Sequence, residues 1–379
     1  MVGPRVLAAV EKCPWPVSTG GRMRIGELWK GFESGQRRLL LFTDPSDAER
    51  EALERAAMGE YCVVTSDDRC DPLGRLEQEA RRWAADIVWA SGPWVGKGRF
   101  DQFTHPLIVD APSLSTRLIG NEILSHGALI RVPGELKRMV SKVLSAPRRI
   151  REERRSWEIA SLITPCSQYE RTQMPRRFQT QSLVVPNGAT ATVPFQKGLA
   201  RAPRLLLVGT LHYPPNAEAA SLLVDRILPQ VRRRHPDVAV DIVGAGPSPV
   251  LHYLRRHKRV VVHGFVDDLE PLYVQASHVV VPLRRHTGTN LKILEAIAHG
   301  VPVVTTAIGL EGLAELRAGR DVAVSRTWKG CVDLLVELLD EPGRSSAMAL
   351  SAWERVHAEL TWDIARRSLR EAMEIVSPG

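Results

Sequence analysis

The sequence predicts an α/β protein built from two doubly wound parallel sheets, each forming its own Rossmann-like domain. Its 379 residues exceed the roughly 250–300 residues at which one hydrophobic core stops growing, so we expect two domains. Short apolar runs recur along the chain, separated by segments long enough for a helix, as in parallel strands joined by crossover helices. A polar stretch with scattered Gly and Pro divides these runs into two sets.

The apolar runs predict the strands. In the first half they are residues 5–10, 38–43, 61–65, 86–90, 106–109, 161–165 and 182–185, and in the second 204–208, 239–243, 259–262, 278–281, 302–305 and 322–325. The predicted division is an N-terminal domain (1–190), a linker (191–202), a C-terminal domain (203–360) and a last helix (361–379) that crosses back to the N-terminal domain. Open α/β sheets bind ligands at the carboxyl ends of their strands, so we expect function in loops that face a cleft between the domains.

Composition narrows the class of protein. With 44% apolar and 25% charged residues, the chain is expected to be folded and globular. It contains no apolar run near the roughly 18 residues of a membrane span, and its start has no signal-peptide core, which predicts a cytoplasmic protein. The net charge of +8 favours an anionic partner. No RNA-binding or zinc-finger motif accompanies the basic stretches, so nucleic acid is not expected.

The richest segment is PLRRHTGTNLKILEAIAHG, between residues 282 and 300. It predicts a strand end, a polar turn and a helix whose N-terminal amides and dipole suit a phosphate. The contributing residues are Arg284, Arg285, Thr287, Gly288, Thr289, Asn290 and Lys292. An ordinary turn followed by a Lys292–Glu295 pair explains the same pattern.

Three further glycine-containing loops follow predicted strands. They hold Gly20, Gly21 and Arg22 in STGGR, Gly244 in VGAGP, and Gly264, Phe265 and Val266 in HGFV. A full GxGxxG is absent, because Pro249 stands three residues after Gly246, and this disfavours a nicotinamide dehydrogenase. Ordinary turns account for each loop equally well.

Taken in order, the segments resemble the retaining family-4 glycosyltransferases (glycosyl transferases group 1), which have the GT-B fold. The similar segments are STGGRMR, VVPNG, LLLVGTLHYPPNAEA, VDIVGAGP, VVVHGFVDDLEPLY, VPLRRHTGTNLKILEAIAHGVPVVTT, GLEGL and LTWDIA. The resemblance extends over most of residues 1–370 and is strongest in the second half. The stretch from Gly288 to Lys292 is similar to a branch of the family that reads GGTxLK.

This resemblance implies an enzyme, a hexosyltransferase-type glycosyltransferase, whose donor is a UDP- or GDP-linked sugar held mainly by the C-terminal domain. Glu295 matches the glutamate that binds the ribose hydroxyls, a task suited to a carboxylate because it accepts from two vicinal hydroxyls. Residues 288–291, which include Leu291, match the turn whose amides meet the donor. Gly20 and Gly21 match the loop that closes over the phosphates, and residues 263–266 match the segment that lines the base. No cofactor is implied.

Two departures from the family pattern concern the donor. Thr287 stands where many members carry a glutamate that contacts the transferred sugar, so the sugar is not implied. The Arg/Lys pair that often follows the first strand of the donor domain is also missing, since Gly209 leads into Thr210, Leu211 and His212.

Another cation must then replace that pair. Two unpaired phosphate charges in a closed cleft would cost several kcal/mol. Lys292 is the expected replacement, with Arg22 or Arg284 as the alternatives.

The resemblance implies front-face attack by the acceptor hydroxyl, with the leaving diphosphate taking its proton, so that catalysis rests on positioning and charge stabilisation. No cluster of metal ligands is evident, and we expect metal-independent transfer. Asp110, at the end of a predicted strand, and His105, before it, are the titratable residues expected near the acceptor hydroxyl, as catalytic candidates.

The acceptor side leaves alternatives open. Trp15, Trp89 and Trp94 could stack on a ring or pack in the core. Residues 133–157 predict an amphipathic helix pair rich in Lys and Arg, with either a solvated face or a face that docks on anionic lipid at the inner side of the membrane. Docking would favour a lipid-linked acceptor of bacterial polysaccharide assembly, and a solvated face a small secondary metabolite. No obligatory protein partner is expected.

Two alternative functions remain at this level. One is a catalytically inactive, nucleotide-sugar-binding partner subunit of the same fold, suggested by Thr287 and the missing basic pair. The other is an epimerase of nucleotide sugars, which would need carboxylates flanking the anomeric carbon. The sequence offers no convincing set of these.

Overall fold

The computed structural model describes residues 3–17, 19–57, 60–64, 71–98, 103–128, 135–190, 203–286 and 288–377. Within these ranges it contains two six-stranded parallel sheets, which confirms the predicted fold class. The strands of the first are β1 (Val6–Val10), β2 (Arg37–Leu41), β3 (Tyr61–Val63), β4 (Ile87–Ser91), β5 (Leu107–Ala111) and β6 (Leu162–Pro165). Those of the second are β7 (Arg204–Val208), β8 (Ala239–Val243), β9 (Val260–Gly264), β10 (His278–Val281), β11 (Val303–Thr306) and β12 (Ala323–Ser325).

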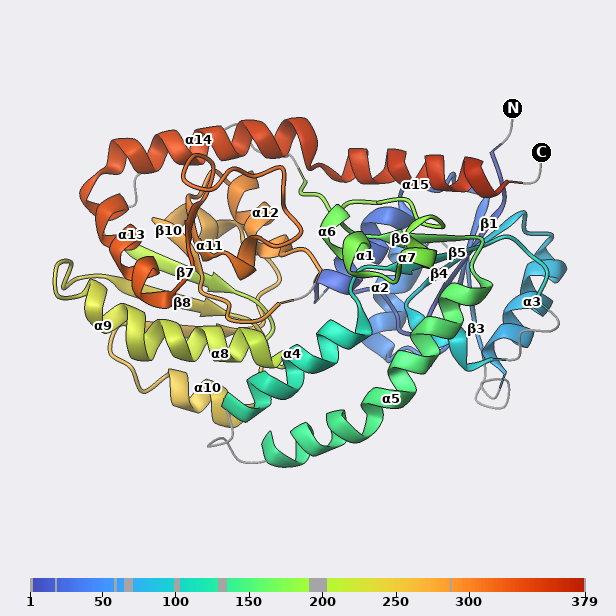
Figure 1. The fold of residues 1–379 in the computed structure, drawn as a ribbon, viewed down its shortest axis with the longest axis horizontal. Coiled ribbons are helices and arrows are strands. Elements are labelled where there is room, and N and C mark those ends of the chain that lie inside the picture. The colour runs from blue at the N-terminus through green and yellow to red at the C-terminus, as the bar shows by residue number, and fades with distance from the viewer. Residues whose placement is uncertain are drawn as a thin grey trace. The chain divides into compact units, whose positions relative to one another are not determined.

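Helices connect the strands in both sheets (Figure 1). In the first half they are α1 (Gly20–Trp29), α2 (Asp47–Ala57), α3 (Pro72–Trp83), η2 (Pro93–Lys97), α4 (Ser115–Ala128), α5 (Glu135–Ile159), α6 (Gln168–Gln173) and α7 (Arg176–Gln179). In the second they are α8 (Pro214–Leu222), η3 (Leu223–Ile227), α9 (Leu228–Val231), α10 (Ser248–Leu254), α11 (Glu270–Gln275), α12 (Leu291–Ala298), η4 (Ile308–Leu310), α13 (Trp328–Asp340), α14 (Pro342–Glu359) and α15 (Trp362–Val376). No helix among the described residues is long and apolar enough to span a membrane.

The chain divides into two compact units that are not contiguous in sequence. Unit 1 comprises Met1–Thr116, Ser145–Asn187 and Trp362–Gly379, and unit 2 comprises Arg117–Leu144 and Gly188–Thr361. Residues 117–144 therefore differ from the predicted N-terminal domain of residues 1–190, because they group with unit 2. The predicted linker, 191–202, lies outside the described residues.

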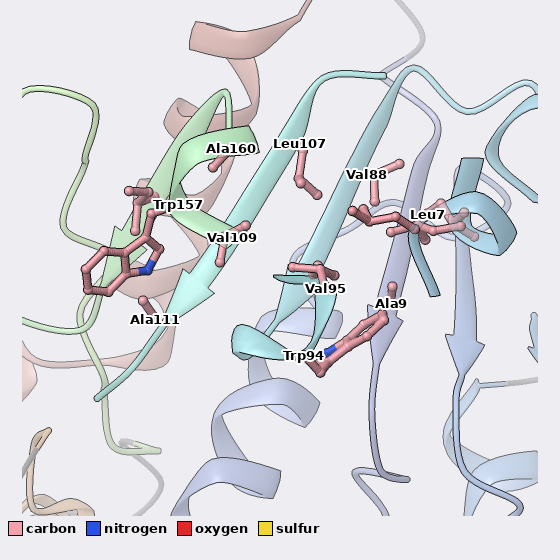
Figure 2. Packing of buried hydrophobic residues seen from close by; sticks show 14 of the residues in the cluster. Leu7, Ala9, Val88, Trp94, Val95, Leu107, Val109, Ala111, Trp157 and Ala160 are labelled. Atoms are coloured by element: carbon pink, nitrogen blue, oxygen red, sulfur yellow. The ribbon is translucent and has the colours of Figure 1, made fainter. Parts of the chain in front are cut away.

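Unit 1 has the strand order β3-β2-β1-β4-β5-β6. Alternate residues of its central strands point to one face of the sheet. Figure 2 shows the core formed there, with Leu7, Ala9, Val88, Leu107, Val109 and Ala111 from the strands against Trp94, Val95, Trp157 and Ala160. Trp89 is also buried, so core packing rather than ring stacking on an acceptor accounts for Trp89 and Trp94.

The other side of unit 1 is closed by the C-terminal helix α15. Its buried residues are Trp362, Ala365, Leu369, Ala372 and Met373. Arg366 on this helix donates to Glu27 Oε2 on α1 at 2.9 Å. The helix thus packs on α1 although about 340 residues of chain separate them.

Unit 2 has the strand order β12-β11-β10-β7-β8-β9. The order reverses between β7 and β10, which are neighbours in the sheet although the strands β8 and β9 lie between them in sequence. Such a reversal places consecutive connections on opposite faces and opens a crevice at the carboxyl ends of the two central strands. In Figure 1, α8–α10 lie on one side of this sheet and α11 and α12 on the other.

Two predicted elements differ from the structure. Residues 182–185 run beside β6 through bonds such as Leu183 N to Ile163 O, but form only an isolated bridge. The next bond of a parallel ladder would come from the backbone nitrogen of residue 165, and Pro165 has no N–H to donate. The predicted helix pair at 133–157 is a single 25-residue helix, α5, with Pro147 inside it. The first two residues of that prediction lie outside the described residues.

Candidate functional site

The candidate site lies at the carboxyl ends of β7, β8 and β10, where the strand order of unit 2 reverses. Two glycines let the loops after β7 and β8 meet. Gly244 has φ +145°, and a Cβ there would lie 2.1 Å from the Gly209 carbonyl oxygen. Gly209, with φ +151°, would place a Cβ 2.7 Å from Asn216 Nδ2. A larger residue at Gly244 would separate the two loops, and one at Gly209 would displace the Asn216 side chain.

Lys292, in the first turn of α12, reaches across the reversal to the end of β7. Its Nζ donates to Asn216 Oδ1 at 2.6 Å, and the Asn216 amide donates to the Thr210 carbonyl at 2.9 Å. The ammonium lies 3.2 Å from where a Gly209 Cβ would stand. The side chain is half-buried, and burial lowers the pKa of Lys292 to about 8 although Glu295 opposes this shift. A cation is thus held at the loop after β7.

Glu295 follows one turn later on the same helix. Burial raises the pKa of its carboxyl to about 7, against the opposing effects of the Tyr273 hydroxyl and of Lys292. Tyr273 Oη lies 3.5 Å from Glu295 Oε2, and its ring stacks on His299 at 4.5 Å between centroids. The carboxyl is therefore fixed in place but incompletely compensated in charge.

The turn before α12 is braced by the loop after β11. Gly288 is buried and has φ +73°, which only glycine adopts easily. The Asn290 amide donates to the Gly309 carbonyl at 2.5 Å, and Thr306 Oγ1 donates to the Leu283 carbonyl at 2.5 Å. Thr289 is partly exposed and Leu291 is buried. Thr287 lies outside the described residues.

The two arginines of this turn are paired inside unit 2. Both contact the buried Glu218 on α8, Arg284 at 3.2 Å and Arg285 at 2.8 Å. Their charges are already partly neutralised, whereas the Lys292 ammonium donates to a neutral amide. This favours Lys292 over Arg284 as the cation for a phosphate.

His286 lies in the same turn and is buried. Burial, followed by the charges of Lys292 and Arg117, lowers the pKa of its imidazole to about 3. The ring is therefore neutral at any physiological pH.

The loop after β9 completes this edge. The Gly244 amide donates to the Gly264 carbonyl at 2.7 Å, so this loop is tied to the loop after β8. Gly264 has φ +78°, and Phe265 leaves 49% of its surface exposed. Val266 is partly exposed, while the His263 ring nitrogen is bonded to Asp241 at 2.7 Å. The exposed aromatic ring of Phe265 is the surface in this loop that could contact a base.

The predicted glycine loop of unit 1 forms the start of a helix. Gly20 and Gly21 are exposed in the first turn of α1, which is capped by Thr19. Arg22 donates to Glu49 Oε1 at 2.7 Å. All three residues lie in unit 1, whereas Lys292 and Glu295 lie in unit 2, so no contact within a single unit brings them together.

Asp110 occupies a buried ion pair. Arg24 Nη2 donates to its Oδ1 at 2.6 Å, Thr164 Oγ1 donates to the same oxygen at 3.0 Å, and both charged side chains are at most 1% exposed. Arg24 also donates to Asn187 Oδ1 at 2.8 Å. A carboxylate enclosed in this way cannot meet an acceptor hydroxyl, so we correct its predicted catalytic role to a structural one.

His105 lies at the opposite end of β5 from Asp110. Its Nδ1 is 2.9 Å from Glu77 Oε2. Burial opposes ionisation of Glu77, but bonds from His105, Thr104 and Arg81 together lower its pKa to about 2. Ligand sites of parallel sheets lie at the carboxyl edge, whereas His105 precedes its strand and lies at the opposite edge.

The candidate site lies within a segment that matches a known family. Residues 202–341 match the family model described as Glycosyl transferases group 1. This segment is a group 1 glycosyl transferase domain. It contains the whole Lys292–Glu295 cluster, and it confirms the prediction of a glycosyltransferase enzyme. The finer assignment to one retaining subgroup is a proposal taken up below.

Relatives and solved structures extend the likeness over most of the chain. The glycogen synthase of Mycobacterium tuberculosis is 29% identical over 331 residues, covering 81% of this chain and 71% of that protein. The sucrose-phosphate synthase of Thermosynechococcus elongatus has a TM-score of 0.74 at 16% identity, with 98% of each chain covered. Alr3699/HepE of Anabaena, solved with UDP and glucose, has a TM-score of 0.70 at 16% identity, covering 98% of this chain and 100% of that one. At these identities the structures show a shared GT-B fold.

Two residues of the cluster were not predicted as site residues. Asn216 follows two prolines in YPPNAEA, and its position at the start of a helix after the first strand of the domain was the available signal. Tyr273 lies in a short helix, and nothing in its sequence neighbourhood indicates that it reaches Glu295. Among the residues that the structure describes, no group of three or more His, Cys, Asp or Glu is placed to hold a metal ion.

Proposed function

We propose that this protein is a retaining glycosyltransferase that moves a sugar from a nucleotide diphosphate-sugar to an acceptor hydroxyl. The observation that carries the proposal is the Lys292–Glu295 cluster, set at the strand-order reversal of a group 1 glycosyl transferase domain. Anionic ligands are favoured there by the free charge of Lys292 and by the N-terminus of α12. The complexes of Alr3699/HepE with UDP and with UDP-glucose support a uridine nucleotide as the first donor to test.

In this proposal each residue of the cluster has one task toward the donor. Lys292 contacts the diphosphate and stabilises the charge that develops as the sugar leaves. Glu295 accepts hydrogen bonds from the two ribose hydroxyls. Phe265 offers a face to the base, and the backbone around Gly288 and Gly209 allows the phosphates to approach closely.

The reaction then proceeds without a protein nucleophile. The acceptor oxygen attacks the anomeric carbon on the face from which the diphosphate departs, and the departing phosphate oxygen takes the acceptor's proton. The configuration at the anomeric carbon is retained. Catalysis consists of holding the acceptor hydroxyl beside the departing diphosphate and of the Lys292 charge, and the transfer is proposed to need no metal ion.

A thermal-shift screen against UDP, GDP, ADP and dTDP, with and without magnesium, tests the donor site. A nucleotide at 100 times its dissociation constant adds about 2.7 kcal/mol to stability, which shifts the midpoint visibly. We expect one nucleotide to stabilise the protein without magnesium and Glu295→Ala to lose the response. Binding without turnover of any nucleotide sugar would instead favour an inactive partner subunit.

We further propose that α5 brings the protein to an anionic membrane, which favours a lipid-linked acceptor. Val140, Val143 and Leu144 follow helical spacing, and they are 46%, 48% and 76% exposed. The helix carries eight Lys or Arg against four Glu. An exposed apolar stripe among basic residues suits the interface of an anionic bilayer.

Sedimentation with vesicles of phosphatidylcholine, with or without phosphatidylglycerol, measures this docking. We expect binding to the anionic vesicles only, weakened by salt and by Leu144→Ser. Leu350→Ser, on the exposed side of α14, is the matched control. Failure to sediment with the anionic vesicles would point to a soluble acceptor.

A further inference from the structure

Helix α4 contacts the candidate site from outside the matched domain. Arg117 Nη2 donates to Glu311 Oε2 at 2.6 Å, and Asn121 Nδ2 donates to the His286 carbonyl at 2.6 Å. The two side chains are four residues apart, so they lie on the same face of the helix. All four residues belong to unit 2, whereas α4 precedes the family match at 202–341 by more than 70 residues.

The two contacts reach two different loops that together frame the N-terminus of α12. His286 lies in the turn after β10, and Glu311 directly follows η4 in the loop after β11. These loops are joined to each other by the Asn290 amide and the Gly309 carbonyl. One face of helix α4 therefore contacts both the turn after β10 and the loop after β11.

The Asn121 contact requires a hydrogen-bond donor at this position. A backbone carbonyl accepts but cannot donate, so the residue facing it must be a donor, as the amide of Asn121 is. The acceptor residue, His286, is six positions before Lys292 in the segment that carries the proposed donor contacts. A shift of this carbonyl would be passed to Lys292 through the short turn between them.

The Arg117 contact is half-buried at both ends, with 23% and 26% of the side chains exposed. The charge of Arg117 is also felt at His286, where it adds to that of Lys292 in disfavouring the imidazolium. Arg117 thus lies close enough to influence the electrostatics of the turn as well as its position.

We propose that Arg117 and Asn121 are positioning residues for nucleotide binding, which act by fixing the two loops around the N-terminus of α12. This rests on the proposed function of the cluster. Neither side chain need touch the donor, and their effect is exerted through the turn at 284–290 and the loop at 306–311. The group 1 domain of this protein accordingly depends on a helix that its family model does not include.

The test measures nucleotide dissociation constants on the full chain, using the nucleotide that gives the largest shift in the four-nucleotide screen. Asn121→Ala removes one hydrogen bond and should weaken binding about 3- to 10-fold. Arg117→Glu opposes like charges at Glu311 and should weaken it at least as much. The double variant Arg117→Glu/Glu311→Arg restores the pair and should return the affinity to within about 3-fold of wild type. Leu124→Ala, which shortens an exposed side chain of the same helix, should leave it unchanged.

The midpoint of thermal unfolding without nucleotide separates positioning from simple structural support. A lower midpoint with unchanged affinity in both single variants, or no recovery in the charge-swap variant, would overturn the positioning role. Failure of the wild-type protein to bind any of the four nucleotides would overturn the proposed function instead. A third outcome would remove only the role of α4 and leave the proposed donor site standing. In that outcome Glu295→Ala abolishes nucleotide binding, while Asn121→Ala and Arg117→Glu bind as the wild-type protein does.

Discussion

The two units share one strand order but use their buried charges in opposite ways. In unit 1, Arg24 and Asp110 are almost fully enclosed, and their hydrogen bonds go to each other, to Thr164 and to Asn187. In unit 2, Lys292 and Glu295 are half-buried, and burial shifts both pKa values toward the neutral forms. The hydrogen bonds and charges of the first pair are satisfied within the protein. The charges of the second pair are incompletely compensated, so a ligand can provide the missing partners.

This difference in compensation distinguishes residues that stabilise the fold from residues that bind a ligand more clearly than residue type does. The sequence made both carboxylates candidates for the site, Asp110 near a strand end as a catalytic residue and Glu295 on a helix as a donor contact. The deciding feature is whether the hydrogen-bonding capacity of the group is already used within the protein. By this criterion Asp110 stabilises the fold, and Glu295 remains available for a substrate.

The largest expected effect is on the stability of unit 1. Asp110→Ala should lower the free energy of unfolding by about 3–5 kcal/mol, because it leaves the Arg24 guanidinium buried without its counter-ion. Urea denaturation followed by circular dichroism measures the loss. Arg24→Met/Asp110→Leu should recover most of it, since apolar side chains of similar volume need no partner. A loss below about 1 kcal/mol for Asp110→Ala would show that the pair is hydrated in solution.

The same kind of substitution in unit 2 should affect affinity and spare stability. Lys292→Met keeps the apolar stem and removes the ammonium, so nucleotide binding should weaken by about 1.5–3 kcal/mol, roughly 10- to 150-fold. The free energy of unfolding should change by less than about 1 kcal/mol, because the half-buried ammonium is incompletely compensated. Isothermal titration calorimetry measures the affinity. An unchanged dissociation constant would transfer the phosphate contact to Arg22 or Arg284.

The smallest effect is the pH dependence of nucleotide binding. Glu295 has a pKa raised to about 7, so its carboxyl is protonated below that pH and accepts from the ribose less well. Lys292 has a pKa lowered to about 8, so it loses its charge above that pH. Affinity should therefore be greatest between about pH 7 and 8 and fall a few-fold on each side.

The control for this profile is Glu295→Gln, measured across the same pH range. The nucleotide's own phosphate titrates near pH 6 (pKa about 6), and the ratio of wild-type to variant affinity cancels that contribution. The ratio should shrink as the pH falls through 7. A ratio that stays constant would mean that Glu295 is ionised throughout or does not contact the ligand.

Most of the fold could be predicted because apolar runs report parallel strands directly. Twelve of the thirteen predicted runs became strands among the described residues. The exception, 182–185, is equally apolar, but Pro165 on β6 has no N–H to donate to it, so the pairing stays a single bridge. Periodicity also could not show that residues 117–144 belong with unit 2, since that depends on side chains such as Arg117 meeting loops almost 200 residues away.

The candidate site was predictable where one continuous segment carries it. Lys292 and Glu295 lie on one turn of helix, and their spacing could be seen in the sequence. Asn216 and Tyr273 come from separate elements and reach the site only through the tertiary structure. Asp110 was predicted as catalytic because the partner that encloses it, Arg24, is 86 residues away in sequence.

The return of α15 to unit 1 has a consequence for biosynthesis. Glu27 on α1 pairs with Arg366, which is synthesised 339 residues later. At about 5–20 residues per second this takes roughly 20–70 s. The surface of unit 1 that α15 covers, which includes part of α1, must stay uncovered during that interval, while unit 2 can already be folding. Unit 1 is the first unit to emerge from the ribosome and the last to complete its fold. We therefore expect chaperones to protect the nascent chain at α1 rather than at the donor domain.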